Sequence, residues 1–180
     1  MANDLWRTPS EVFNTLNREF NFVADMACSK ENKLCEVGFT EEDDSLSLDW
    51  KYEADSIGDR DLYNNYVWLN CPYSNPMPWI KKAQEAQKDG LGVVMLLNAD
   101  CSVGWFFEAL KTVSEVRFIV SDGIPEGKTK HASGRIGFLD GYGKPQGGNN
   151  KPQMILVFNP FKIGARITSY INKSELYLNA

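Results

Sequence analysis

The sequence predicts an α/β fold, a mostly parallel β-sheet with helices on both faces. Three observations lead to this prediction. Short apolar runs typical of buried strands alternate along the chain with segments whose apolar residues recur at helical spacing. One run, residues 91–97, is apolar throughout, as expected of a strand covered on both faces. A length of 180 residues with 43% hydrophobic content suits one domain around a single core.

The first predicted element is a helix. Thr8 is expected at its N-cap, Pro9 at its first helical position, and Glu11 three residues after the cap to complete a capping box. Apolar residues then recur at helical spacing at Val12, Phe13, Leu16 and Phe20. This helix is therefore predicted to bury one face.

Strands and helices then alternate. The predicted strands cover residues 22–25, 34–39, 66–69, 91–97, 116–120 and 154–158, and the predicted helices cover 76–88 and 102–110. In sheets of this kind ligands bind at the carboxyl ends of the strands. Asp25 and Asn70, which end or follow two of the strands, are therefore expected at a ligand site.

The composition excludes several function classes. The four cysteines contain no C-x-x-C pair and there is one histidine, so no metal site is predicted. The single histidine without a G-x-S-x-G elbow also argues against a Ser-His-Asp hydrolase. No apolar stretch reaches the ~20 residues of a membrane span, and the N-terminus lacks a secretory pattern, so a cytoplasmic protein is expected.

Charge is divided unevenly along the chain. Residues 1–66 contain 6 Lys and Arg against 15 Asp and Glu, whereas residues 67–180 contain 13 against 9. Eight of the 14 glycines lie within residues 122–153, together with several basic side chains. A segment of this kind between core strands is more often functional than structural, although a disordered surface loop is the alternative.

The tetrapeptide Asn70-Cys71-Pro72-Tyr73 follows a predicted strand and resembles the Asp/Asn-Pro-Pro-Tyr motif of amino-methyltransferases. The lone pair of adenine N6 is delocalised into the ring, so an enzyme must make it available for attack on a methyl group. The Asn70 side-chain oxygen and the Pro72 carbonyl would each accept one N–H as positive charge develops on the nitrogen. Tyr73 would stack on the base, and Cys71 replaces the usual proline. Taken alone, the four residues also suit an ordinary turn.

The whole chain resembles the phage-type DNA adenine-N6 methyltransferases. The order and spacing of short blocks carry the resemblance, among them Trp6-Arg7-Thr8-Pro9, Asp25-Met26-Ala27-Cys28-Ser29, Asn70-Cys71-Pro72-Tyr73-Ser74 and Gly134-Arg135-Ile136-Gly137-Phe138. It implies a Rossmann-like class I methyltransferase fold, with residues 1–180 as a single domain. It also implies that the glycine-rich basic segment at about 122–153 is a target-recognition loop.

The resemblance implies S-adenosylmethionine as the cofactor. The residues it implies for cofactor binding are Trp6, Thr8, Pro9, Asp25, Asn32, Asp44 and Ser45. Asp25 would hold the amino group of the methionine moiety, and Asp44 would accept from the adenosine amine. A strand-end cap is the alternative for Asp25, and a solvated turn for Asp44. The usual Gly-x-Gly does not follow the first predicted strand.

The implied partner is double-stranded DNA, whose target adenine must be flipped out of the helix. Candidates for phosphate contact and sequence readout are Lys81, Lys82, Lys128, Lys130 and Arg135. Arg135 would alternatively brace the loop through a carboxylate. The oligomeric state stays open, a monomer included. The phage resemblance implies action in the bacterial cytoplasm and a link to restriction–modification.

Two other functions stay open. A methyltransferase acting on protein glutamine or RNA adenine would use the same tetrapeptide, because Asn-x-Pro-Tyr serves planar amides and amines in general. A degenerate DNA-binding or anti-restriction protein that has lost catalysis is the other, supported by Cys71 and the missing Gly-x-Gly.

Overall fold

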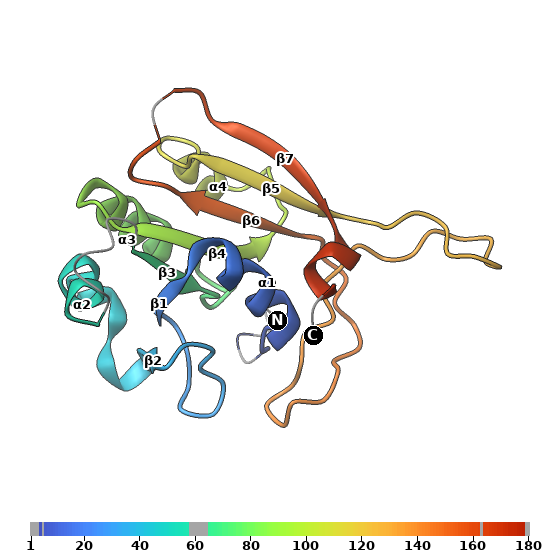
Figure 1. Cartoon of the computed structure of the whole chain (residues 1–180), viewed down its shortest axis with the longest axis horizontal. Coiled ribbons are helices and arrows are strands. Elements are labelled where there is room, and N and C mark those ends of the chain that lie inside the picture. Colours follow the sequence, from blue (N-terminus) through green and yellow to red (C-terminus); the bar gives the residue numbers. More distant parts are fainter. Residues whose placement is uncertain (1–3, 5, 58–64, 163, 179–180) are drawn as a thin grey trace.

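The computed structural model describes residues 4, 6–57, 65–162 and 164–178 and contains a seven-stranded sheet (Figure 1). The strands are β1 (Phe22–Asp25), β2 (Val37–Gly38), β3 (Tyr66–Leu69), β4 (Gly92–Asn98), β5 (Glu115–Val120), β6 (Gln153–Phe158) and β7 (Ile167–Asn172). The α-helices are α1 (Ser10–Phe20), α2 (Trp50–Ile57), α3 (Met77–Lys88) and α4 (Gly104–Ala109). Three 3₁₀ turns are η1 (Glu41–Asp43), η2 (Ser45–Ser47) and η3 (Lys173–Tyr177).

The sheet is mostly parallel, as predicted. Its strand order is β2-β1-β3-β4-β6-β5-β7. β1 pairs in parallel with β2 and β3, β3 with β4, and β5 with β7. Among the described strands only β6 is reversed, pairing antiparallel with both β4 and β5. The carboxyl ends of β1, β3, β4 and β5 therefore share one edge of the sheet.

Helices cover both faces, which confirms the predicted layering. On one face α2, α3 and α4 pack on alternate residues of the central strands, including Val93 and Met95 of β4. On the other face α1 and η3 pack on the intervening residues, including Val94 and Leu96. Every residue from 92 to 97 is buried, because the two-residue period of a strand places its neighbours in opposite cores.

The start of α1 corrects one prediction. The helix forms and buries Val12, Phe13 and Leu16, but Pro9 is its N-cap and no side chain caps it. The backbone N–H of Phe13 donates to the Pro9 carbonyl at 3.2 Å. The Thr8 hydroxyl makes no capping bond because the helix begins one residue later than the capping box requires. Thr8 is instead buried in the extended segment before the helix.

Two other elements are much shorter than predicted. The strand expected at 34–39 is only β2, and the helix expected at 102–110 is only α4. Two elements, α2 and β7, were not predicted. In α2 the described buried residues are Trp50 and Ala54, one turn apart, which is too little periodicity to recognise in an octapeptide of mixed polarity. β7 is an edge strand without a fully buried residue, so its sequence lacks the apolar run of a core strand.

None of the helices in the described ranges combines the length and apolar character needed to cross a bilayer.

Candidate active site

The site lies where β1 and β3 end side by side. Asp25, the last residue of β1, is in register with Trp68, and Asn70 directly follows β3. The Met26 backbone N–H donates to the Trp68 carbonyl at 2.9 Å, which continues the pairing past the end of β1. Neighbouring strands lie about 4.8 Å apart. The structure therefore brings Asp25 and the tetrapeptide to the same edge, as the sequence predicted.

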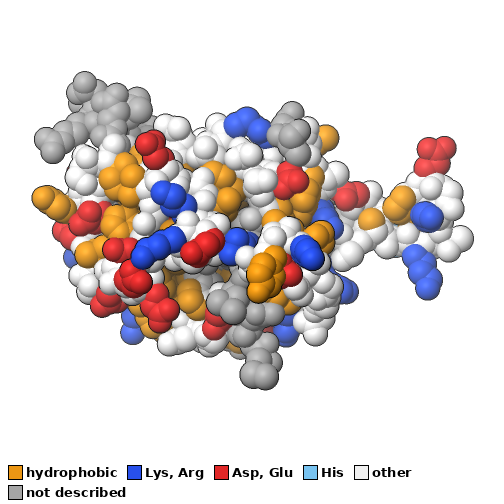
Figure 2. Space-filling view, turned by 90° about the horizontal axis from the view of Figure 1, so that it is seen from below, with side chains coloured by type: hydrophobic (Ala, Val, Ile, Leu, Met, Phe, Trp, Pro, Cys, Tyr) orange, Lys and Arg blue, Asp and Glu red, His pale blue; other side chains and the backbone are white. Residues whose placement is uncertain are grey.

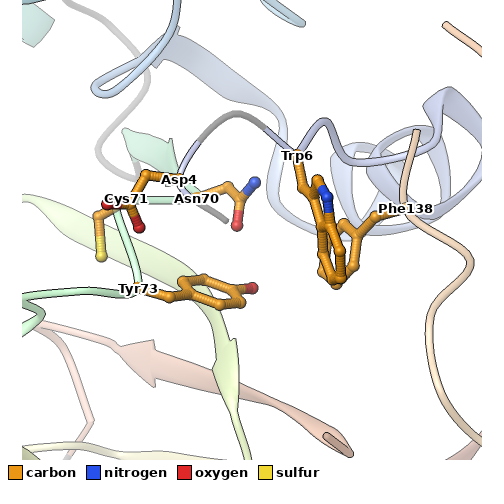
Figure 3. Close-up of a pocket in the computed structure, with 6 residues that line it drawn as sticks. All are labelled: Asp4, Trp6, Asn70, Cys71, Tyr73 and Phe138. Atoms are coloured by element: carbon orange, nitrogen blue, oxygen red, sulfur yellow. The ribbon is translucent and has the colours of Figure 1, made fainter. Parts of the chain in front are cut away.

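A small pocket opens at the tetrapeptide (Figure 3). It is lined by Asp4, Trp6, Asn70, Cys71, Tyr73 and Phe138. Figure 3 shows Asn70 and Tyr73 on one side of an open space, with Trp6 backed by Phe138 on the other. The pocket thus combines the Asp4 carboxylate, the Asn70 amide and the Cys71 thiol with three aromatic rings.

Three buried polar atoms of this pocket find no hydrogen-bond partner within the described ranges. They are Asn70 Oδ1, Trp6 Nε1 and the Tyr73 hydroxyl. Leaving one such atom buried without a partner costs about 1–3 kcal/mol. Buried polar groups in folded proteins are normally satisfied by protein or by ordered water, so three such atoms in one pocket mark it as the candidate site.

The aromatic wall opposite Asn70 joins two distant parts of the chain. Arg7 and Leu139 form an isolated antiparallel bridge in which each backbone N–H donates to the other carbonyl at 2.9 Å. This bridge sets Trp6 beside Phe138, and their ring centroids stack at 5.7 Å. Tyr73 meets Phe138 edge-on at 6.1 Å. The N-terminal segment and the glycine-rich segment therefore build one side of the pocket together.

The titratable groups of the tetrapeptide are held neutral. Burial is the main reason that the pKa of the Cys71 thiol rises far above its usual range. Burial also raises the pKa of the Tyr73 hydroxyl well above 10. Since only a thiolate is a strong nucleophile, Cys71 is not equipped for covalent catalysis. The hydroxyl of Tyr73 keeps its proton and can act as a hydrogen-bond donor.

Asp25 is almost fully buried, and burial raises its pKa to about 7 against an ordinary value of 3.8. Its two carboxylate oxygens accept from the backbone N–H groups of Ala27 at 3.3 Å and Leu34 at 3.2 Å, which partly offsets that rise. Asp25 therefore does act as the strand-end cap considered above. These two bonds leave acceptor capacity on the carboxylate, which can take further donors.

The other predicted cofactor residues lie in several environments. Thr8 Oγ1 and Ser45 Oγ are buried, and the described part of the chain offers neither a hydrogen-bond partner. Asn32 accepts the Ser29 N–H through its side chain at 2.6 Å and so closes a turn. Asp44 lies between η1 and η2, where its side chain is exposed and its backbone adopts the left-handed conformation, with φ of 46°. The pocket of Asn70 includes Trp6 but not these four residues.

The glycine-rich segment leaves the sheet between β5 and β6 and forms two projections. The first, here called the arm (residues 121–133), extends beyond the body of the molecule (Figures 1 and 2). Its base is closed by the Ala132 N–H donating to the Gly123 carbonyl at 2.8 Å, and a turn at Pro125 and Lys128 forms its tip. The second, here called the hairpin (residues 138–146), is organised by Asp140 and exposes Tyr142.

A buried amide network fixes the base of both projections. Gln153 is fully buried, and its Oε1 accepts the Ile136 N–H at 2.9 Å and the Asn149 side-chain N–H at 3.1 Å. The Gln153 amide in turn donates to Asn98 Oδ1 at 3.3 Å. Gly134 sits so close to the chain that an added Cβ would lie 2.6 Å from the Val120 carbonyl carbon. The base of the glycine-rich segment is therefore held against the sheet by buried hydrogen bonds and close packing.

The predicted DNA contacts differ in accessibility. Lys128 and Lys130 are exposed on the arm. Arg135 is exposed near its base, where Nη1 donates to the Asn149 carbonyl at 3.3 Å instead of to the carboxylate considered above. Lys81 is exposed, but the Lys82 side chain is only 11% exposed and pairs with Glu85 at 2.8 Å.

Sequence reasoning did not place two of the pocket residues there. Asp4 accepts the Ser74 N–H at 3.0 Å and so ties the N-terminus to the chain after Tyr73. Phe138 and Ile136 are buried although they lie in a polar, glycine-rich segment. Two isolated apolar residues in such a segment could have indicated that part of it is buried, because large apolar side chains are most often found in the interior.

Comparison with known proteins identifies the family of this chain. The family model described as "DNA N-6-adenine-methyltransferase (Dam)" matches residues 1–179. A protein of Escherichia phage T1 named "DNA N-6-adenine-methyltransferase" is 36% identical over 175 residues, covering 94% of this chain and 69% of the relative. A protein of the same name from Haemophilus phage HP1 is 32% identical over 178 residues, covering 96% and 89%. The chain belongs to the Dam family of DNA N-6-adenine-methyltransferases.

Proposed function

We propose that this protein transfers a methyl group to the N6 amine of adenine in double-stranded DNA. The observation that carries the proposal is Asn70 Oδ1, which has no partner among the described residues and is buried in a pocket with aromatic walls at the carboxyl end of β3. An amide oxygen there accepts an N–H from an exocyclic amine. The family and the names of the phage relatives support the same substrate.

The chain's own residues act on the amine. Asn70 Oδ1 accepts one N6–H, and the Pro72 carbonyl accepts the other, which draws the nitrogen towards tetrahedral geometry and frees its lone pair. Both acceptors oppose the positive charge that develops on nitrogen in the transition state, in surroundings from which water is largely excluded. Tyr73 packs against the flipped base. With its thiol neutral and buried, Cys71 contributes shape and no proton transfer.

S-adenosylmethionine is the proposed donor, and it supplies an electrophilic methyl group on a sulfonium. Two buried hydroxyls without a partner in the described part of the chain, Thr8 Oγ1 and Ser45 Oγ, fit a polar ligand, and the buried Asp25 carboxylate fits its amino group. Pro9, Asn32 and Asp44 complete the proposed set. The parallel order of β1, β3 and β4 supports the proposal of a Rossmann-like class I fold.

The whole chain is proposed to be one methyltransferase domain with residues 122–153 as its target-recognition loop. The duplex hides N6 within the base pair, so the base must be flipped into the pocket. The arm leaves the sheet at β5, whose carboxyl end lies on the same edge as that of β3, and it carries Lys128 and Lys130 towards phosphates. Arg135 and Lys81 are further contacts. Lys82 could contact a phosphate only after its ion pair with Glu85 is broken.

The phage relatives support a role in bacterial cells, where the protein would act on DNA in the cytoplasm and protect it from restriction.

The decisive experiment supplies labelled S-adenosylmethionine and unmodified duplex DNA, and maps the product by methylation-sensitive sequencing. Label on adenine N6 at a defined site is the expected result. RNA and glutamine-containing peptides compete in the same reaction, and label transferred to either would favour those substrates instead. Binding of S-adenosylmethionine is measured in parallel by calorimetry. Absence of both binding and transfer would favour a non-catalytic DNA-binding protein.

The arm is tested separately by salt dependence. Each lost phosphate contact lowers the slope of log affinity against log salt by about 0.9. We expect Lys128→Ala and Lys130→Ala to weaken DNA binding with shallower slopes. Lys88→Ala is the matched control, because Lys88 is exposed at the far end of α3, away from the edge that carries Asn70. If the slope of log affinity against log salt is the same for all three variants, the arm does not contact DNA phosphates.

A further inference from the structure

The loop that carries the tetrapeptide has few hydrogen bonds of its own. Among the described residues, the backbone of residues 71–75 makes a single hydrogen bond, in which the Ser74 N–H donates to Asp4 Oδ1 at 3.0 Å. The side chains of Cys71 and Tyr73 pack against the core and are held there. The backbone after Tyr73 therefore depends on Asp4 for its hydrogen bonding.

Asp4 is held in turn by the segment that follows it. Arg7, three residues on, exchanges two backbone hydrogen bonds with Leu139 at 2.9 Å, and its Nη1 donates to the Glu31 carbonyl at 3.2 Å. Three residues span at most about 10 Å, so Asp4 cannot move far from this anchor. Figure 3 shows Asp4 on the same side of the pocket as Asn70.

The direction of the Pro72 carbonyl matters for the proposed reaction, in which it accepts one N6–H while positive charge develops on the nitrogen. An acceptor stabilises that charge best if it already points at the amine, because hydrogen bonds weaken steeply when they are misaligned. The turn at Tyr73 and Ser74 directly follows this carbonyl. A hydrogen bond that fixes Ser74 therefore restricts the direction of the carbonyl.

We propose that Asp4 is a positioning residue, which holds the turn after the tetrapeptide through the Ser74 N–H and so keeps the Pro72 carbonyl directed at the amine. This inference rests on the proposed function and deepens it. Asp4 acts through the backbone of the loop, so the reaction requires its acceptor oxygen and not its charge.

The test compares Asp4→Ala with Asp4→Asn in single-turnover methylation, with S-adenosylmethionine and duplex DNA both saturating. We expect Asp4→Ala to lower the rate constant roughly tenfold, because a small misplacement of a group that acts on the reacting atom slows the reaction. The affinities for S-adenosylmethionine and DNA should stay near the wild-type values. Asp4→Asn keeps an acceptor oxygen in the same place and should restore most of the rate.

Asp49→Ala is the matched control. Asp49 is exposed like Asp4, and its Oδ1 also accepts a backbone N–H at 3.0 Å, that of Tyr52. It precedes α2 and does not line the pocket. Loss of this bond should change the thermal unfolding temperature about as much as Asp4→Ala does, and should leave the single-turnover rate constant at the wild-type value.

Hydrogen exchange of the Ser74 amide reports the tie without any turnover. The Ser74 N–H should exchange more slowly in the wild-type protein and in Asp4→Asn than in Asp4→Ala, because only the alanine variant lacks an acceptor. Equal exchange in the wild-type protein and Asp4→Ala would show that the bond does not hold the turn, and would overturn the inference even if Asp4→Ala were inactive.

The outcomes separate this inference from the proposed function. Absence of methylation by the wild-type protein, with the Ser74 amide protected by Asp4, would defeat the proposed function and leave the tie without a catalytic purpose. An unchanged rate in Asp4→Ala, or an equal loss of rate in Asp49→Ala, would overturn the positioning role alone. Failure of Asp4→Asn to restore the rate, with its Ser74 amide protected, would mean that the carboxylate charge is needed instead.

Discussion

Replacing Asn70 by alanine should separate stability from catalysis. Asn70 Oδ1 is buried without a partner in the described structure, so the folded protein bears a desolvation cost of about 1–3 kcal/mol for it. Asn70→Ala removes that cost together with some packing, and we expect the free energy of unfolding to stay level or rise by about 1 kcal/mol. Turnover should nevertheless fall about 10²–10³-fold, the usual effect of removing one preorganised partner of developing charge.

The assay combines urea unfolding, single-turnover methylation and calorimetry with S-adenosylmethionine. Cofactor affinity should stay near the wild-type value, because Asn70 acts on the amine. Asn98→Ala is the control for stability, since Asn98 ends the next strand with its Oδ1 already accepting from Gln153, and its loss should destabilise the fold. Asn70→Asp should retain measurable turnover. A destabilisation above about 2 kcal/mol in Asn70→Ala, or turnover within tenfold of wild type, would refute the reasoning.

Three further predictions follow from single contacts. Asp25 has a folded pKa of about 7 against an ordinary value of 3.8. A raised carboxyl pKa stabilises the fold at low pH, so the free energy of unfolding should fall by about 3 kcal/mol between pH 4 and 7, and urea unfolding of Asp25→Asn should lack that fall. Gly134→Ala places a Cβ 2.6 Å from backbone and should weaken DNA binding in a filter assay, whereas Gly137→Ala, with nothing within 4 Å, should not. Thr8→Val removes a buried hydroxyl unpartnered in the described ranges; calorimetry should show about tenfold weaker S-adenosylmethionine binding, and unchanged affinity would exclude Thr8 from the site.

Local patterns were sufficient for much of the fold. The run 66–69 is β3 without change, and the run 91–97 is β4 shifted by one residue, because a core strand must be apolar wherever it is covered. The helices at α1 and α3 also followed from apolar spacing. Elements with little burial escaped prediction. The edge strand β7 depends on its parallel partner β5 for its hydrogen bonds, and a partner 52 residues away in the sequence cannot be recognised from a local pattern.

The residues of the candidate site also fall into two groups, those that local sequence predicts and those that only the fold brings together. The sequence was sufficient to predict that Asn70 to Tyr73 follow a buried strand and that Asp25 ends another, because both predictions depend on neighbours in the chain. That Trp6 and Phe138 face Asn70 across one pocket follows from the three-dimensional fold alone. Their contact requires the bridge between Arg7 and Leu139, formed by residues far apart in sequence. The fold also decided which polar atoms lack a partner, since satisfaction of a hydrogen bond is a property of three-dimensional surroundings and not of residue type.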